Sequence, residues 1–215
     1  GGLYLYNNSD VTITNSSVVN DTAYYYGGGI YSTNTTLSLN NVQVDSNQAK
    51  QYGGGLYMYN DSLTAVNTTF NYNTATDNNS RGGGVYINST GTYVFNSCRI
   101  QHNTSEDRGG GVYCDNASPI FTNTIITDNV VTGTDSYDGG GGVYLESSNG
   151  DPSFINVTIA NNTANKGGGL YRYSGDPTFI NSIIWHNTAT ESPSIYSGVG
   201  SGSVTYSNVE GGYTG

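Results

Sequence analysis

The chain has 215 residues and a formal net charge of -10, because 16 acidic residues outnumber 6 basic ones. So few basic residues argue against nucleic acid as a partner, since phosphate binding needs a basic stripe. The sequence has no run of about 18 apolar residues, so it predicts no membrane span.

One phrase recurs along the chain: glycines, then an apolar residue, then a tyrosine. Full copies have three glycines, as in Gly53 to Tyr57, and Gly1 to Tyr4 is the same phrase short of one glycine. The period is roughly 27 residues, which is in the range of repeat architectures. The tyrosines that end the copies, named marker tyrosines here, are Tyr4, Tyr31, Tyr57, Tyr86, Tyr113, Tyr144 and Tyr171, and Tyr196 ends a degenerate eighth copy.

Each repeat begins with a predicted strand. Apolar residues and tyrosines alternate after the glycines, as in Leu56 to Tyr59, and alternation predicts a strand with one buried face. We expect the marker tyrosines to point outward. The residues expected to point inward are Leu3, Ile30, Leu56, Val85, Val112, Val143, Leu170 and Ile195.

A polar turn and a second phrase, typified by Phe179 to Ala189, complete the repeat. Asparagines stacked at its corners can hydrogen-bond from coil to coil through their side-chain amides. The first polar column is Asn15, Asn41, Asn67, Asn96, Asn123, Asn156 and Asn181, each preceded by an inward residue: Ile13, Leu39, Ala65, Val94, Phe121, Phe154 and Phe179. The second column is Asp21, Asn47, Asn73, Asn129, Asn162 and Asn187; Asn103 joins it after one extra residue, so we expect a bulge near Arg99.

Three short strands and three turns fit one period. The period is too short for a propeller blade of about 40–45 residues, and no helical periodicity is present. The sequence therefore predicts an all-β fold, a right-handed parallel β-helix solenoid of about eight coils of roughly 27 residues. We expect residues 1–215 to form a single parallel β-helix domain, within a longer chain or a stacked assembly.

The repeated motifs Phe-Ile-Asn-x-x-Ile, Asn-x-Thr-Ala and Gly-Gly-Gly-x-Tyr occur in this order in the chain. The chain thereby resembles the secreted parallel β-helix repeat proteins of bacteria and archaea, including the polymorphic outer-membrane-type adhesin repeats. The segment from Asn181 to Tyr213, in which the phrase Asn181 to Ala189 precedes the phrase Tyr206 to Gly212, is similar to the end of such domains in proteins of the choice-of-anchor type. The resemblance implies a secreted or surface-displayed, mostly non-enzymatic stalk or adhesin, although β-helices also host polysaccharide lyases and hydrolases.

Composition favours an extracellular location, because Asn, Ser, Thr and Gly dominate the chain. Two cysteines are too few for a disulfide framework, so we expect Cys98 and Cys114 to be buried free thiols, with a disulfide as the alternative. Asn-x-Ser/Thr triplets are glycan acceptors in a secreted protein, but an Asn- and Thr-rich chain also makes them by chance. They stand at Asn7, Asn15, Asn20, Asn34, Asn60, Asn67, Asn78, Asn88, Asn103, Asn116, Asn156 and Asn161.

The positions of the titratable residues do not favour a catalytic site. His102 and His186 fall three coils apart and cannot share a metal, so we expect no metal and no cofactor. Arg81, Arg108 and Lys166 stand directly before triple glycines, where the two arginines could line a groove of the lyase kind. Acid–base catalysis needs convergent groups, and we expect solvated loop charges instead. The acidic residues near the arginines are Glu106, Asp107, Asp135 and Asp138.

The outward marker tyrosines are the remaining signal for function. A file of tyrosines from Tyr4 to Tyr171 offers flat apolar area with polar tips, which suits sugar faces and protein interfaces. The alternative is an aromatic stack that only stabilises the sheet.

These observations predict a non-enzymatic extracellular structural or adhesive module. Joining Thr214-Gly215 to Gly1-Gly2 would regenerate the repeated phrase, so we expect head-to-tail stacking into a filament or a flanking β-helix. The expected partners are further copies of the chain and cell-surface glycans. The alternatives are a carbohydrate-binding module that uses the tyrosine file, and a polysaccharide lyase or hydrolase at Arg81 and Arg108.

Overall fold

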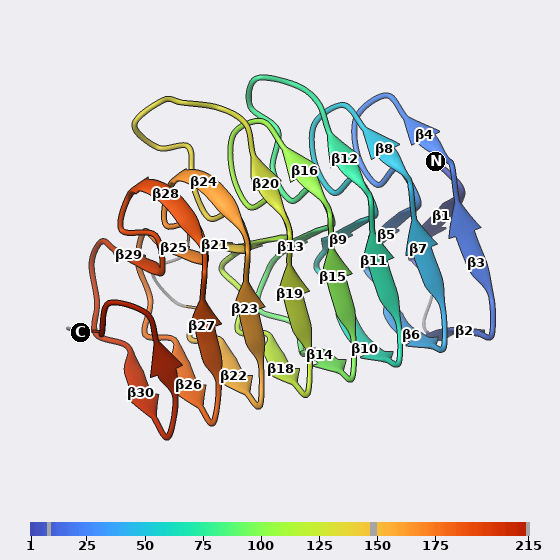
Figure 1. The fold of residues 1–215 in the computed structure, drawn as a ribbon. Helices are drawn as coiled ribbons and strands as arrows, with labels where there is room; N and C mark the ends of the chain where they lie inside the picture. The colour runs from blue at the N-terminus through green and yellow to red at the C-terminus, as the bar shows by residue number, and fades with distance from the viewer. Residues whose placement is uncertain (8–9, 147–149, 214–215) are drawn as a thin grey trace.

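The computed structural model of the protein describes residues 1–7, 10–146 and 150–213, which form a rod of stacked β-coils (Figure 1). The rod is a right-handed parallel β-solenoid of about eight coils, as predicted. Each strand pairs in parallel with the equivalent strand one coil further on, and this pairing produces four long sheets, named A to D here. Thr214 and Gly215, on which the filament hypothesis partly depends, lie outside the described residues.

Sheets A and B contain the first two strands of each coil. Sheet A consists of β1 (Leu3–Tyr6), β5 (Ile30–Thr33), β9 (Leu56–Tyr59), β13 (Val85–Asn88), β17 (Val112–Asp115), β21 (Val143–Leu145), β25 (Leu170–Arg172) and β29 (Ile195–Ser197). Sheet B consists of β2 (Asp10–Thr14), β6 (Thr36–Asn40), β10 (Ser62–Val66), β14 (Tyr93–Asn96), β18 (Ile120–Thr122), β22 (Ser153–Ile155), β26 (Thr178–Ile180) and β30 (Ser203–Thr205).

Sheets C and D complete the coils. Sheet C consists of β3 (Ser17–Val19), β7 (Gln43–Asp45), β11 (Thr69–Asn71), β15 (Arg99–Gln101), β19 (Ile125–Thr127), β23 (Thr158–Ala160), β27 (Ile183–Trp185) and β31 (Asn208–Val209). Sheet D consists of β4 (Thr22–Ala23), β8 (Gln48–Ala49), β12 (Thr74–Ala75), β16 (Thr104–Ser105), β20 (Val130–Val131), β24 (Thr163–Lys166) and β28 (Thr188–Glu191).

The prediction of three strands per coil is wrong, because sheet D supplies a fourth. Several of its strands are two residues long, such as β12 with Thr74 and Ala75. A strand of this length is too short for the alternation of buried and exposed residues by which strands are recognised in a sequence. The recurring Thr-Ala pair was the only sequence sign of sheet D.

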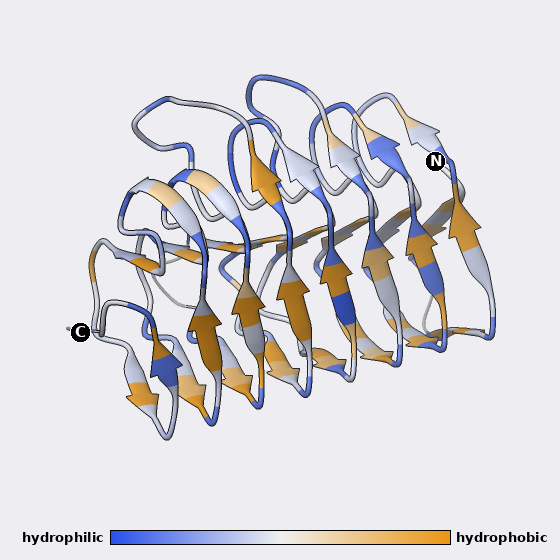
Figure 2. Ribbon diagram, in the orientation of Figure 1, coloured by the Kyte–Doolittle hydropathy of each residue, from blue (hydrophilic) through white to orange (hydrophobic). Residues whose placement is uncertain are grey.

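The predicted inward residues of sheet A fill the lumen. Six of them are fully buried, and Leu3 and Ile195 of the outer coils are partly buried against the same core. Sheet B adds a stack of phenylalanine rings whose centroids are 4.8, 5.1 and 4.7 Å apart. Figure 2 shows hydrophobic residues on the strands and hydrophilic residues at many corners. The stacked rings are Phe95, Phe121, Phe154 and Phe179.

A ladder of buried asparagines joins the coils at the corner between sheets C and D. In Asn73, the backbone amide and Nδ2 both donate to Oδ1 of Asn103, at 2.9 and 3.1 Å. The same Nδ2 also donates to the carbonyl of Val44 at 2.8 Å, so the buried amide is fully used. The predicted bonding between coils is confirmed for this column. Its ladder members are Asn47, Asn73, Asn103, Asn129, Asn162 and Asn187.

Coil four departs from the predicted alignment by one residue. Ser97, with a φ of 55°, occupies the left-handed corner that Asn96 was predicted to occupy. The inward residue is correspondingly Phe95, which is fully buried, while Val94 is only partly buried. The prediction placed Asn96 at the corner because asparagine usually favours this conformation, but a serine adopts it here.

No bulge occurs near Arg99, so that prediction is also wrong. Arg99 pairs in register with Thr69 on one side and Ile125 on the other. The extra residue of coil four lies earlier, between Asn88 and Tyr93, in the turn that joins sheets A and B.

The glycines are required for backbone conformation and for close packing between coils. Gly82 has a φ of +66°, a conformation that other residues rarely adopt. A Cβ on Gly84 would lie 2.7 Å from the carbonyl oxygen of Gly111 and 2.9 Å from Nδ2 of Asn103. The phrase is therefore a device of the fold rather than a ligand-binding loop.

Candidate functional site

The marker tyrosines stack ring on ring along the outer face of sheet A. Neighbouring ring centroids are 4.5 to 5.4 Å apart, and neighbouring ring planes lie within 23° of parallel. The register of the strands sets this spacing, since Tyr86 pairs with Tyr57 on one side and Tyr113 on the other. The tyrosine row consists of Tyr4, Tyr31, Tyr57, Tyr86, Tyr113, Tyr144, Tyr171 and Tyr196.

A second column covers this row. Its members stand directly before the triple glycines and form a ladder of isolated parallel bridges. In the first coils the covering groups are aromatic: Tyr26 stacks on Tyr57 at 5.0 Å, and Tyr52 stacks on Tyr86 at 4.9 Å. This cover column consists of Tyr26, Tyr52, Arg81, Arg108, Gly139 and Lys166.

In later coils the covering groups are cations. The guanidinium of Arg81 lies 5.2 Å from the ring centroid of Tyr113, and that of Arg108 lies 5.4 Å from Tyr144. Such contacts between cations and ring faces are attractive, and more so when they are shielded from water. Gly139 supplies no side chain, because a Cβ there would collide with the ring of Tyr171.

The cover column contradicts the expectation of an exposed tyrosine file. Tyr86, Tyr113, Tyr144 and Tyr171 point away from the lumen as predicted, but they are at most 4% exposed. Tyr31 and Tyr57 are partly buried, and of the predicted binding tyrosines only Tyr4, at 70%, is exposed. The prediction failed because loops fold back over the sheet.

The arginines of the cover column are tied to Glu146. Arg108 Nη1 donates to Oε2 of Glu146 at 2.9 Å. The hydroxyl of Tyr113 donates to the same oxygen at 3.0 Å and accepts a hydrogen bond from Arg81 Nη1 at 2.9 Å. The expectation of solvated loop charges is wrong here, since the two arginine side chains are only 25% and 16% exposed.

A pair of buried carboxyl groups lies in the same network. Asp107 Oδ2 is 3.4 Å from Arg108 Nε, and Asp107 also forms a side-chain hydrogen bond with Asp138. Burial, and next this hydrogen bond, raise the pKa of Asp107 well above its ordinary value, while the arginines oppose the shift. In the folded protein Asp107 therefore keeps its proton to a higher pH than an ordinary aspartate.

This network could be predicted only in part from the sequence. Arg81 and Arg108 were identified by their place before the glycines, and the acidic residues were identified as their neighbours. Their contacts with Tyr113 and Glu146 depend on the path of the loops, which a sequence pattern does not specify.

A polar groove of about 430 Å³ lies at the corner between sheets A and B. It is lined by turn residues of three successive coils, among them Asn34, Asn60 and Ser89. Asp61 in this groove is 3% exposed, and the backbone amide of Thr35 donates to its Oδ1 at 2.6 Å. Burial raises the pKa of Asp61 to about 6.

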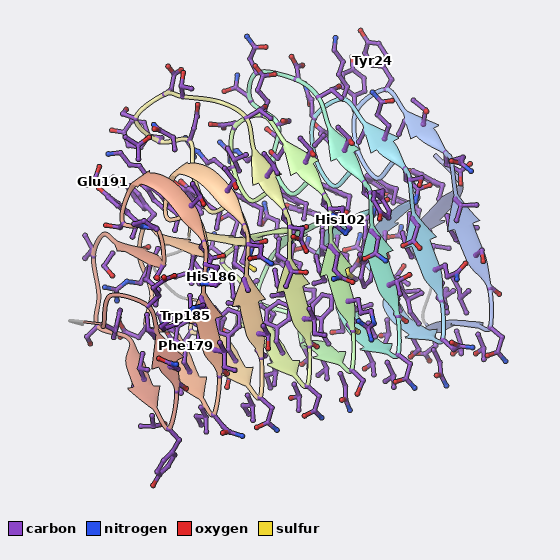
Figure 3. All side chains as sticks on the ribbon, in the orientation of Figure 1. Tyr24, His102, Phe179, Trp185, His186 and Glu191 are labelled. Atoms are coloured by element: carbon purple, nitrogen blue, oxygen red, sulfur yellow. The ribbon has the colours of Figure 1, made fainter. Side chains whose placement is uncertain are left out.

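The two histidines lie on separate coils and are labelled in Figure 3. His102 stacks on Tyr72 at a centroid distance of 4.7 Å, and His186 lies beside Trp185. Among the residues that the structure describes, no three His, Cys, Asp or Glu side chains gather in a group that could hold a metal ion.

Both cysteines are buried and free, as predicted. Cys98 occupies a corner position that Thr124 holds one coil on, and its Sγ contacts the carbonyl of Ala65 at 3.4 Å. Burial raises the pKa of Cys98 to about 11, and burial also raises that of Cys114. Neither thiol is suited to nucleophilic chemistry.

The glycosylation triplets lie mostly at exposed corners. Asn103 is the exception, because its fully buried amide donates to the Phe70 carbonyl and to Asn129 Oδ1. A glycan on Asn103 is incompatible with this ladder, and Asn88 is only partly exposed. The exposed candidates are Asn7, Asn15, Asn20, Asn34, Asn60, Asn67, Asn78, Asn116, Asn156 and Asn161.

Comparison with known proteins agrees with the geometry of the coils. A family model described as a right handed beta helix region matches residues 1–163 and again residues 83–211. No curated protein and no solved structure matches the chain significantly. Within residues 1–7, 10–146 and 150–213 no helix is long and apolar enough to cross a membrane. Since the family matches extend over most of the sequence, the chain belongs to the right-handed beta helix family.

Proposed function

We propose that this protein is a non-enzymatic structural and adhesive module that works outside the cell as a stiff rod. The observation that carries the proposal is the continuity of its side-chain ladders. The buried asparagines, the phenylalanines and the tyrosine row connect successive coils through side chains as well as through the backbone. Stability in such a stack comes from interfaces between neighbouring repeats, which suits a spacer that must hold its shape.

The exterior supports an extracellular role. Ten glycosylation triplets have exposed asparagines, and several tyrosines away from the row, such as Tyr72 and Tyr206, are also exposed. Each of the four sheets has outermost strands with a single neighbour, for example β1 and β29 in sheet A. Stacking on a second copy or on a flanking β-helix would pair these edges, and this stacking is part of the proposal.

The arginine network favours a non-enzymatic role over a lyase. In a lyase site the arginines would face the substrate, whereas Arg81 and Arg108 are engaged with Tyr113, Tyr144 and Glu146. Depolymerisation of uronate polysaccharides by the purified protein, abolished by Arg108→Ala, would contradict this part of the proposal.

Single-molecule pulling along the rod axis tests the structural role. We expect the coils to resist force, and Asn103→Ala should lower the force needed to unfold the middle coils. Asn40→Ala is the matched control, because Asn40 is exposed and lies outside the buried ladder. Equal forces for the two variants would argue against a rod that depends on its ladders.

Electron microscopy and surface labelling test the assembly and the location. Head-to-tail stacking predicts filaments at high protein concentration, whereas isolated short particles would contradict stacking. Antibodies against the protein should label intact cells, and labelling only after the cells are opened would contradict the extracellular location.

Carbohydrate binding is a second candidate function, favoured by exposed tyrosines in the first coils. Tyr24 and Tyr25 are 67% and 54% exposed and form an edge-to-face pair at 4.6 Å, with Lys50 Nζ 5.1 Å from the Tyr24 ring. Exposed rings with a nearby cation suit the face and the hydroxyls of a sugar. Binding on a glycan array should be lost in Tyr25→Ala and kept in Tyr206→Ala, which removes a ring that is 91% exposed elsewhere. Binding that survives Tyr25→Ala would refute this site.

A further inference from the structure

The tyrosine row is a continuous path of oxidisable rings. From Tyr57 through Tyr86 to Tyr113, each step between ring centroids is 5.1 Å, with ring planes within 9° of parallel. Phenol side chains lose single electrons more readily than most other side chains. Rings in contact at this spacing can exchange electrons without any rearrangement of the chain.

A branch connects this path to the solvent. Tyr24 contacts Tyr25 at 4.6 Å, Tyr25 contacts Tyr26 at 5.9 Å, and Tyr26 stacks on Tyr57 at 5.0 Å. Figure 3 shows Tyr24 on a loop that projects from the rod near its N-terminal end. An oxidant in solution can therefore reach the branch, although it cannot touch the buried rings.

Tyr113 differs from its neighbours in the contacts of its hydroxyl. It donates to the Glu146 carboxylate at 3.0 Å, whereas the Tyr86 hydroxyl has a longer contact of 3.4 Å with the Asn88 amide. The buried Tyr144 hydroxyl has no hydrogen-bond partner among the described residues. An oxidised phenol must release its proton, so oxidation is favoured at the ring that already donates to a base.

Burial protects the same ring. Tyr113 is 0% exposed, and the guanidinium of Arg81 covers its face. A radical there is shielded from dissolved reductants and from coupling with a radical on another molecule. Arg81 Nη1 also remains available to hydrogen-bond the oxygen after the proton has left.

We propose that the tyrosine row carries oxidising equivalents from exposed rings to Tyr113, where they are held as a neutral tyrosyl radical. The oxidants are one-electron acceptors, such as oxidised metal complexes or organic radicals. The oxidant takes one electron from a ring of the exposed branch. Electrons then move from ring to ring until Tyr113 is the ring that lacks an electron. The O–H bond of Tyr113 breaks, and its proton passes to Oε2 of Glu146.

The net products are the reduced oxidant, the Tyr113 radical and a neutral Glu146 carboxyl group. One electron from a reductant, together with the proton held on Glu146, restores the phenol. This activity is independent of the structural role, and it would let an extracellular rod absorb oxidising radicals without breaking its backbone.

A tethered photo-oxidant tests the proposal at a defined entry point. Lys50 is exposed and lies against Tyr24, so Lys50→Cys places a reactive thiol beside the branch. The native cysteines are buried, which leaves the new thiol as the site for a ruthenium polypyridyl label. A flash in the presence of a sacrificial cobalt(III) acceptor generates the oxidant. Transient absorption and electron paramagnetic resonance then follow the tyrosyl radical.

Phenylalanine variants separate the path from its end point, because they keep the ring stack and remove only the redox-active hydroxyl. In the labelled protein we expect a long-lived radical that is lost in Tyr113→Phe. It should also be lost in Glu146→Gln, which removes the proton acceptor. Tyr86→Phe interrupts the path and should greatly reduce the signal, whereas Tyr171→Phe, the matched change beyond Tyr113, should preserve it.

Two outcomes would overturn the proposal. One is an unchanged long-lived radical in Tyr113→Phe. The other is an equal signal in Tyr86→Phe and Tyr171→Phe. Circular dichroism confirms that each variant is folded, and the comparison of Tyr86→Phe with Tyr171→Phe remains decisive even if Tyr113→Phe fails to fold.

Discussion

The tyrosines of the row all end the same repeated sequence phrase, but they lie in two different environments. In the early coils Tyr31 and Tyr57 are partly exposed, whereas Tyr86, Tyr113 and Tyr144 further along are buried. Tyr57 and Tyr86 lie under the tyrosines Tyr26 and Tyr52, while Tyr113 and Tyr144 lie under arginines bound to carboxylates. Alternation along a strand decides which side chains leave the lumen. The loops decide whether those side chains meet water.

The asparagine ladder is common to both regions, and breaking it should have the largest effect. Asn103→Ala would leave several buried groups unpaired, including the Phe70 carbonyl and the backbone amide of Asn73. Each buried group left unpaired costs about 1–3 kcal/mol, so the loss in the free energy of unfolding should be at least about 3 kcal/mol. Urea denaturation followed by circular dichroism measures this loss.

The control for this change is again Asn40→Ala. Asn40 is exposed at the end of β6, and replacing it should change the free energy of unfolding by less than about 0.5 kcal/mol. A ladder variant as stable as this control would show that the buried amides contribute little.

The cover column should contribute more to the stability of the protein where its side chains are buried. Arg108→Met leaves Glu146 and Asp107 without their common cation, and it should destabilise the protein by about 2 kcal/mol at neutral pH. Lys166→Met removes the cation that pairs with the exposed Glu191, and it should have little effect. Equal urea midpoints for the two variants would mean that burial of the middle coils does not strengthen their charge network.

Stability should also fall as the pH rises from about 4 to about 8. Burial raises the pKa of Asp61 to about 6 and raises that of Asp107 above its ordinary value. In this range the folded protein keeps protons that the unfolded chain, with ordinary aspartate pKa values near 4, has already released. Acidic pH therefore favours the folded state, and this contribution is lost as the pH passes through the raised pKa values.

The expected decrease in the free energy of unfolding is at least about 2 kcal/mol, obtained from urea denaturation curves at the two ends of the pH range. Asp107→Asn removes the ionisable group, so it should flatten the part of the stability–pH profile that comes from the middle coils. Asp135→Asn, at an exposed position on the equivalent loop of the next coil, should leave the profile unchanged. A profile that is identical in both variants would show that Asp107 does not keep its proton in the folded protein.

The solenoid could be predicted from the sequence because each coil solves the same packing problem with the same residue types. Leu56 and Val85, for example, occupy equivalent lumen positions, so their spacing reports the period directly. The fourth strand was missed because two residues cannot alternate. The corner at Ser97 was missed because a serine, and not the asparagine found in other coils, adopts the left-handed conformation there.

The sequence did not allow the burial of the tyrosine row to be predicted, and the reason is different. It depends on where loops of variable length travel after they leave the strands, and on a contact between Asp107 and Asp138 from different coils. No local pattern encodes such a contact. The positions of Arg81 and Arg108 before the glycines were visible in the sequence, but their side chains turn toward the sheet rather than toward solvent.

Nitration of the native protein, followed by peptide mass spectrometry, tests most directly whether loops cover the tyrosine row. Tyr25, Tyr137 and Tyr206 are exposed and should react with tetranitromethane in the folded state. Tyr113 and Tyr144 should react only after unfolding, because both rings are 0% exposed. Nitration of Tyr113 and Tyr144 at the rate of Tyr206 in the folded protein would contradict a covered row.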